Sequence, residues 1–107
     1  NAWKTKKVNG VVRWSYYDSD GRRVSNAWKQ ITDNGMMNWY HFGADGYMDT
    51  GWFKDADGSW YYLNPVSDGT QGAMKTGWFT DPQDGHLYYL DPKTGAMVTG
   101  NIQNDSV

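Results

Sequence analysis

The sequence predicts an all-β protein built as a solenoid of stacked β-hairpin repeats, with almost no helix. Three observations support this prediction: the apolar residues are mainly aromatic, glycine turns are frequent, and aromatic landmarks recur about every 25 residues. The 107-residue chain holds seven Trp and eight Tyr while Leu and Ile are scarce, so burial must come mainly from aromatic side chains. Thirteen Gly and no long run of strong helix formers favour short strands joined by turns.

The clearest hairpin spans residues 51–63. Aromatic runs there flank the pair Asp57-Gly58, and Asp-Gly between such runs is a strong hairpin signal. A lone hairpin is marginally stable because it cannot bury its apolar face against itself. The hairpin therefore needs neighbours, and the rest of the chain supplies similar segments.

The loop length of this hairpin decides which rings share a face. A two-residue loop would pair Trp60 with Asp55, whereas a three-residue loop with a bulge would pair Trp60 with Ala56. We favour the second register, since it separates the rings into two sensible groups. One face then carries Trp52, Lys54, Trp60 and Tyr62, and the other carries Phe53, Tyr61 and Leu63.

Three landmarks repeat in the same order in four units. Each unit opens with a tryptophan, continues to an aromatic run, and ends in a glycine turn with a short strand. The opening residues are Trp3, Trp28, Trp52 and Trp78, and the aromatic runs begin at Trp14, Trp39, Trp60 and Leu87. We predict a single repeat domain with units 1–25, 26–50, 51–76 and 77–99 and a partial terminal unit 100–107.

The predicted units are unequal. The first two landmarks lie further apart in the first two units than in the last two, which predicts longer hairpin loops there. The connection 64–72 is also longer than its counterparts and should bulge from the surface. After Gly100 no aromatic residue follows, so the array is expected to stop with a capping half unit.

Composition argues against several classes of function. The net charge is −2 without a basic cluster, so nucleic acid is an unexpected partner, and no apolar run is long enough for membrane insertion. His41 and His86 lack a matched nucleophile or carboxylate pair, and the Asp-rich turns 18–21 and 55–58 lack the glutamate that closes a calcium loop. With no cysteine either, we expect no catalytic residue, no metal and no cofactor.

The excess of rings itself suggests a binding function. Two indoles on one face, joined by a tyrosine from the next hairpin and a methionine thioether, would form an open-sided box. Such a box suits a quaternary ammonium, which is attracted to ring faces, and it equally suits the flat apolar faces of a sugar.

The repeated motifs resemble the choline-binding repeats of Gram-positive cell-surface proteins and lysins. The similarity is closest from about Trp39 to Gly100, and it rests on Gly51-Trp52, Trp60-Tyr61-Tyr62-Leu63 and two glycine-methionine segments, 72–78 and 95–100. The resemblance implies a left-handed β-solenoid that binds choline on teichoic acids between consecutive repeats. Related repeats of glucan-binding domains and clostridial toxins share these signals and bind carbohydrate.

The resemblance also implies two binding boxes. One would combine Trp28, Trp39, Met48 and Tyr62, and the other Trp52, Trp60, Met74 and Tyr89. The pair Trp3 and Trp14 is weaker, because Arg23 falls near the methionine position and His41 replaces the tyrosine. Trp78 is weaker too, because Leu87 replaces its second tryptophan.

The expected function is thus a non-catalytic, extracellular module that attaches a larger surface protein or wall hydrolase to choline of the cell wall. Two alternatives stay open: a repeat domain that binds a glucan or cell-wall glycan, and a structural solenoid that acts as a spacer or self-associates. Homodimerisation through a terminal repeat also stays open.

Overall fold

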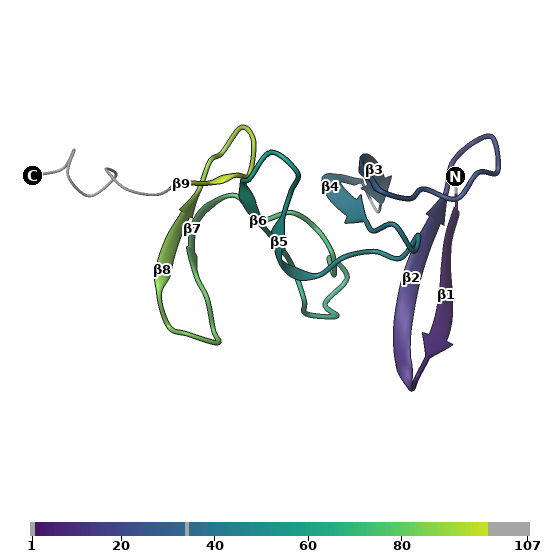
Figure 1. Ribbon diagram of the computed structural model, residues 1–107, viewed down its shortest axis with the longest axis horizontal. Coiled ribbons are helices and arrows are strands. Elements are labelled where there is room, and N and C mark those ends of the chain that lie inside the picture. The colour runs from purple at the N-terminus through teal and green to yellow at the C-terminus, as the bar shows by residue number, and fades with distance from the viewer. Residues whose placement is uncertain (1, 34, 99–107) are drawn as a thin grey trace, which may run out of the picture.

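The chain is all-β, as predicted. The computed structural model describes residues 2–33 and 35–98, and the regular structure of this part consists of nine strands (Figure 1). They are β1 (Ala2–Val8), β2 (Val11–Tyr17), β3 (Ala27–Asp33), β4 (Met36–Phe42), β5 (Gly51–Lys54), β6 (Trp60–Leu63), β7 (Gly77–Thr80), β8 (Leu87–Leu90) and β9 (Met97–Val98). The predicted terminal unit 100–107 lies outside the described residues.

The described strands form four antiparallel hairpins. The pairs β1–β2, β3–β4 and β5–β6 are two-stranded sheets, and β9 adds to the hairpin β7–β8. The strands of the first two hairpins have seven residues, whereas those of the third hairpin and the pair β7–β8 have four. The prediction of longer loops was therefore wrong: Val8 pairs with Val11, and the tight Asn9-Gly10 turn between them has φ values of 51° and 79°.

The favoured register of the third hairpin was also wrong. Trp60 pairs with Lys54, not with Ala56, and Trp52 pairs with Tyr62. The loop is longer than predicted because Asp55 and Ser59 close it, with the Asp55 N–H donating to the Ser59 carbonyl at 2.9 Å. The predicted division of faces holds nevertheless, since a slip of two residues keeps every side chain on its side.

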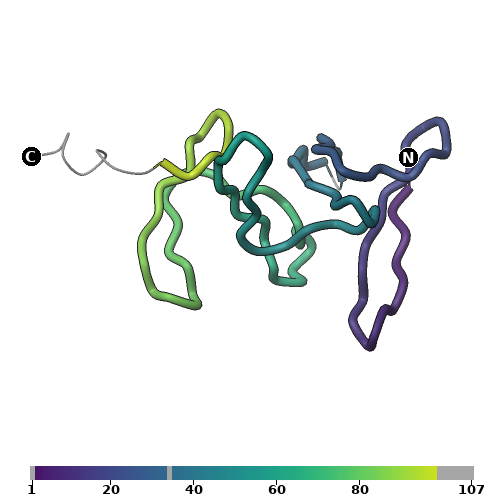
Figure 2. Tube along the Cα trace, viewed as in Figure 1, coloured from purple at the N-terminus to yellow at the C-terminus, as the bar shows by residue number. Residues whose placement is uncertain are grey.

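The hairpins follow one another along the longest axis of a body of 51 × 29 × 28 Å (Figure 2). Backbone bonds connect neighbours: the Met48 N–H donates to the Trp14 carbonyl at 2.7 Å, and the Met74 N–H donates to the Trp39 carbonyl at 2.8 Å. In each case the residue after a glycine turn bonds to the second strand of the preceding hairpin. Consecutive hairpins are thus joined by main chain as well as by rings.

The deepest core residues occupy one equivalent position. Phe42, Leu63 and Leu90 each end the second strand of a hairpin and are fully buried. The turn glycines pack tightly beside this core, because a Cβ at Gly72 would collide with the Met48 thioether. The same collision would occur between Gly95 and Met74, so each methionine lies against the glycine turn of the following unit.

The long connection 64–72 is a compact loop. Asn64 is 2% exposed, and its side-chain amide donates to Asp68 Oδ1 at 3.1 Å and to Thr70 Oγ1 at 2.9 Å. These bonds hold the loop to a single path although it has no regular structure.

Candidate ligand-binding site

Three hollows lie between successive hairpins, and the same set of two tryptophans, one tyrosine and one methionine lines each of them. One hairpin contributes two indoles, and the following unit contributes a tyrosine and a methionine. Pocket A contains Trp3, Trp14, Tyr40 and Met48; pocket B contains Trp28, Trp39, Tyr61 and Met74; pocket C contains Trp52, Trp60, Tyr88 and Met97.

The rings of pockets A and C stand nearly at right angles. In pocket A the Trp3 ring centroid lies 5.9 Å from that of Trp14 and 5.2 Å from that of Tyr40, with interplanar angles of 87° and 74°. In pocket C the Trp52 centroid lies 6.4 Å from that of Trp60, at 83°, and 4.9 Å from that of Tyr88, at 71°.

In pocket B the Trp28 and Tyr61 centroids are 4.9 Å apart, at 67°. Trp39 and Trp60, the outer walls of pockets B and C, are 41% and 40% exposed. Perpendicular walls with an exposed outer ring make the open-sided box that the composition suggested.

The alternation of side chains along β6 explains which tyrosine enters a pocket. Tyr61 pairs with Phe53 on the face that looks back at the preceding hairpin, where its ring meets Trp28. Tyr62 pairs with Trp52 on the opposite face, is 4% exposed, and packs at 4.2 Å on Phe79 of the following hairpin. Tyr62 is thus a core residue and Tyr61 is the pocket residue.

The structure therefore groups the sequence-predicted residues differently. Trp28 and Trp39 meet as predicted, as do Trp52 and Trp60, but the tyrosines are Tyr61 and Tyr88 instead of Tyr62 and Tyr89. Each methionine lines the pocket that precedes the predicted one: Met48 lines pocket A and Met74 lines pocket B.

The first junction, predicted as weak, has a complete set of walls. Tyr40, which precedes His41 in the chain, supplies the tyrosine, and Met48 supplies the thioether. Trp78 has no comparable set among the described residues: it is 61% exposed and faces Tyr89 of its own hairpin at 4.8 Å.

Carboxylates accompany the indoles and were missed in the sequence. The Trp28 Nε1–H donates to Asp55 Oδ2 at 2.9 Å, and the Trp52 Nε1–H donates to Asp81 Oδ2 at 2.8 Å. The Trp28 hydrogen bond, followed by one from the Ala56 backbone, lowers the pKa of Asp55. Each aspartate directly follows the first strand of the next hairpin, a regularity that a comparison of the units could have revealed.

The three pocket tyrosines stay protonated at neutral pH. Burial raises the pKa of Tyr40 and of Tyr61, while the hydrogen bond from Tyr88 to Asp84, 2.6 Å long, raises the pKa of Tyr88. The ring walls are therefore neutral, and the negative charges near the pockets come from aspartates.

The rims of pockets A and B come from the unit after next. Pocket A is closed by Ser67, Gly69 and Gln71 of the connection 64–72, and pocket B by Lys93 and Thr94 of the turn after β8. The cavity volumes rise from about 230 Å³ in pocket A through 380 Å³ in pocket B to 450 Å³ in pocket C.

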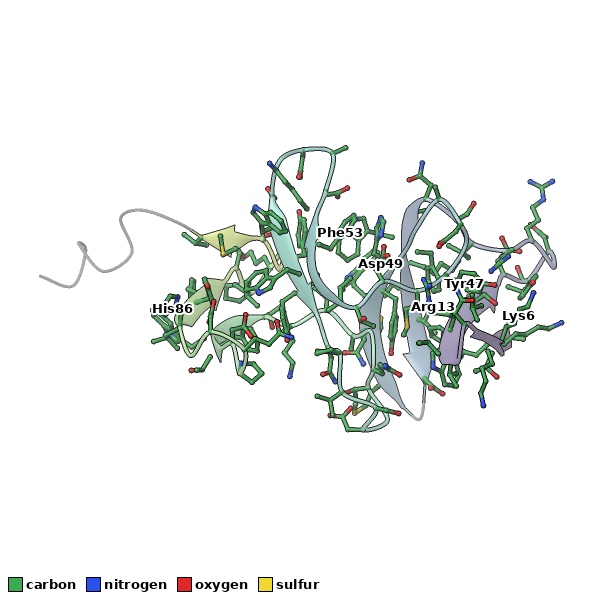
Figure 3. The ribbon with its side chains drawn as sticks, turned by 60° about the horizontal axis from the view of Figure 1, so that its bottom comes forward. Lys6, Arg13, Tyr47, Asp49, Phe53 and His86 are labelled. Atoms are coloured by element: carbon green, nitrogen blue, oxygen red, sulfur yellow. The ribbon has the colours of Figure 1, made fainter. Side chains whose placement is uncertain are left out.

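Each of the two histidines lies close to an aspartate. His41 Nδ1 lies 2.7 Å from Asp49 Oδ2, and its ring stacks on Phe53 at 4.0 Å. Asp49 and Phe53, both labelled in Figure 3, thus hold the His41 ring in place. His86 lies on the surface, 3.6 Å from Asp84. Within the described ranges there is no cluster of three potential metal-ligating side chains and no helix long and apolar enough to cross a membrane.

Comparisons with known proteins agree with this architecture. A family model described as a choline-binding repeat matches residues 28–70 and 68–101. Among solved structures, choline binding protein F of Streptococcus pneumoniae is similar to the chain at 38% identity and a TM-score of 0.67, over 90% of this chain and 28% of that one.

A pneumococcal cell-wall endolysin from phage Cp-1, complexed with choline, is similar at 35% identity and a TM-score of 0.62, over 91% of this chain and 25% of that one. An alternansucrase in complex with isomaltononaose is similar at 30% identity and a TM-score of 0.58, over 91% of this chain and 7% of that one. The chain thus spans about a quarter of the first two proteins. A search of curated protein sequences found no match. The family match covers more than half of the chain, and the chain belongs to the choline-binding repeat family.

Proposed function

We propose that this chain is a non-catalytic module that binds choline groups in pockets A, B and C. The proposal rests mainly on one observation: the same set of two Trp-bearing walls, one tyrosine and one methionine recurs at three successive junctions. A trimethylammonium group cannot donate ordinary hydrogen bonds, and neutral ring faces attract it by about 0.5–2 kcal/mol per site.

The charges around the pockets support a cationic ligand. Asp33 lines pocket A, Asp55 lines pocket B, and Asp81 and Asp84 line pocket C. Carboxylates beside the rings attract the positive charge of choline. The round trimethylammonium group contacts more surface between walls that meet at right angles than it would on a flat surface. Ethanolamine should bind more weakly, because its ammonium is better hydrated and would leave donors unpaired in the box.

We further propose that the hairpins form a solenoid which spaces the pockets along a cell-wall polymer. The backbone bonds from Met48 and Met74 to the preceding hairpins support regular stacking. Single pockets should bind in the millimolar range, about −4 kcal/mol, while three pockets on one choline-bearing teichoic acid would bind tightly through avidity. On this proposal the module acts outside the cell, as the attachment part of a longer surface protein or wall hydrolase.

A choline titration followed by tryptophan fluorescence tests the proposal. The intact chain should saturate at millimolar choline, and both Trp39→Ala and Trp60→Ala should lower the signal and the number of sites. Trp78→Ala is the matched control, because Trp78 is exposed and lies outside pockets A to C. No response to choline up to tens of millimolar would refute the proposal.

A glycan ligand is the second candidate, because the similar alternansucrase structure holds isomaltononaose. A glycan would need hydroxyl-directed hydrogen bonds in addition to ring stacking, and its binding would not respond to choline. If a soluble α-glucan quenches the fluorescence where choline does not, the glycan reading replaces the choline reading. If neither ligand acts, a structural spacer is left.

A further inference from the structure

Pockets A and B share their walls and differ in the charges of their rims. In pocket A the rim residues Ser67, Gly69 and Gln71 are neutral, and Asp33 is the one charged residue of its described lining. Pocket B carries two opposite charges, with Asp55 beside the indole of Trp28 and Lys93 on the turn that closes the pocket.

Lys93 reaches pocket B from two units away. The pocket walls Trp28 and Trp39 belong to the hairpin β3–β4, whereas Lys93 lies after β8, in the turn whose Gly95 packs against Met74. The tight contact between Gly95 and Met74 fixes this turn at the mouth of the pocket. The Lys93 N–H also donates to Asp91 Oδ1 at 2.7 Å, which holds its backbone in place independently of its side chain.

The two charges of pocket B match those of a zwitterion. Phosphocholine carries a trimethylammonium at one end and a phosphate at the other, joined by a two-carbon bridge. With the trimethylammonium among the rings near Asp55, the phosphate would extend toward the rim, where Lys93 lines the pocket. Bare choline gains nothing from Lys93, because an ammonium at the rim repels a cation.

We infer that pocket B selects phosphocholine over free choline through Lys93, while pocket A does not distinguish the two. This inference rests on the proposed function and adds a specificity-determining residue to it. Since Lys93 is solvent-exposed, its pairing with the phosphate should change affinity by about two- to fivefold and should weaken with salt.

Site-resolved titration tests the inference. The indole N–H signals of Trp14 and Trp39, assigned by single substitutions, report pockets A and B in nuclear magnetic resonance spectra of the full chain. Choline and phosphocholine are titrated separately at low ionic strength. The ratio of choline to phosphocholine dissociation constants should be about two- to fivefold higher for Trp39 than for Trp14.

Three variants sharpen the test. Lys93→Gln should remove the difference, and Lys6→Gln, which deletes a charge from β1 outside the lining of both pockets, should preserve it. Ser67→Lys should confer the preference on pocket A, because Ser67 occupies the rim there. Addition of 0.5 M salt should lower the ratio for pocket B. At this ionic strength the Debye length is below about 8 Å, so the attraction between Lys93 and the phosphate is screened.

The outcomes separate the two proposals. Equal ratios at both pockets, or a ratio at Trp39 that survives Lys93→Gln, would overturn the zwitterion site while choline binding itself stands. Absence of any signal change with either ligand would refute the proposed function and this inference with it.

Discussion

Trp3 and Trp52 hold the same place in their hairpins, and rings surround both indoles, but the Trp52 indole also makes a hydrogen bond to a carboxylate. Trp3 is surrounded by rings, with centroids of Tyr16 and Phe42 at 5.1 and 5.8 Å, and its N–H has no hydrogen-bond partner among the described residues. Trp52 has similar ring neighbours, with centroids of Tyr62 and Tyr88 at 5.0 and 4.9 Å, and in addition its N–H donates at 2.8 Å to Asp81, which is almost completely buried. Both junctions are packed with rings, and the junction of Trp52 adds a charged hydrogen bond.

The difference follows from one residue in the next hairpin. The third residue after the opening tryptophan is Ile31 in the second unit, Asp55 in the third and Asp81 in the fourth. Ile31 is 4% exposed and belongs to the core cluster, so it extends the apolar packing. A carboxylate at this position replaces that burial with a directional bond. The same ring geometry can therefore be held in two ways, which predicts different responses to substitution and pH.

The largest expected effect is in the apolar junction. Phe42→Ala should lower the free energy of unfolding by about 3–5 kcal/mol, because a fully buried ring next to Trp3 is lost. Chemical denaturation followed by tryptophan fluorescence measures the change, with Phe42→Leu as a milder variant if the first does not fold. Leu87→Ala, at a side chain that is 61% exposed, should change stability by less than about 0.5 kcal/mol. Equal costs at the two positions would contradict this account of the core.

The polar junction should depend on its carboxylate. Asp81→Ala should cost about 1–3 kcal/mol, because the Trp52 N–H and the Gln83 N–H both lose their acceptor. Asp81→Asn keeps an acceptor oxygen of similar shape and should recover part of the loss. The same denaturation experiment applies, and an unchanged midpoint for Asp81→Ala would show that the hydrogen bond does not stabilise the junction.

A smaller effect on stability should distinguish the steric contact of a turn glycine from the strain of its backbone. Gly72 and Gly58 have similar φ values of 89° and 87°, but only a Cβ at Gly72 would collide with Met48. Gly72→Ala should therefore be more destabilising than Gly58→Ala by about 1–2 kcal/mol, and it should also weaken ligand binding in pocket A. Equal losses in both variants would mean that Met48 moves aside without cost.

The smallest effect concerns pH. The pKa of Asp55 is lowered by the hydrogen bonds from Trp28 and Ala56, so its charged form favours the folded state. This contribution is present above the ordinary aspartate pKa of about 3.9 and is lost as the pH falls through the lower pKa of the folded chain. Denaturation midpoints between pH 7 and pH 3 should fall less steeply in Asp55→Asn than in the unsubstituted chain. Parallel profiles would show that Asp55 adds no pH dependence.

Much of the candidate site could be predicted from the sequence. The repeated landmarks, together with the family resemblance, predicted the tryptophan pairs Trp28 with Trp39 and Trp52 with Trp60, which line common pockets. Alternation along β5 and β6 also placed Trp52 and Tyr62 on one face, which the strand register confirms. These features are local, because side-chain direction in a strand has a period of two whatever surrounds the strand.

The choice between neighbouring tyrosines was not local. Tyr62 shares a face with Trp52, which made it the natural choice, but each pocket forms where that face meets the opposite face of the next hairpin. Tyr61 and Tyr88 point backward across this junction, and Met74 reaches it through a backbone bond to Trp39. The pairing of faces depends on how hairpins stack, which no single hairpin encodes.

By itself, the sequence determined the all-β class, the hairpins, the ring inventory and the family. Tertiary structure decided that Tyr40 and Met48 complete pocket A, that Asp55 and Asp81 hold the indoles, and that Lys93 reaches the rim of pocket B. The physical reason is range: strand alternation and turn chemistry act over a few residues, whereas each pocket joins side chains from two or three successive units whose relative placement is set only when the hairpins pack.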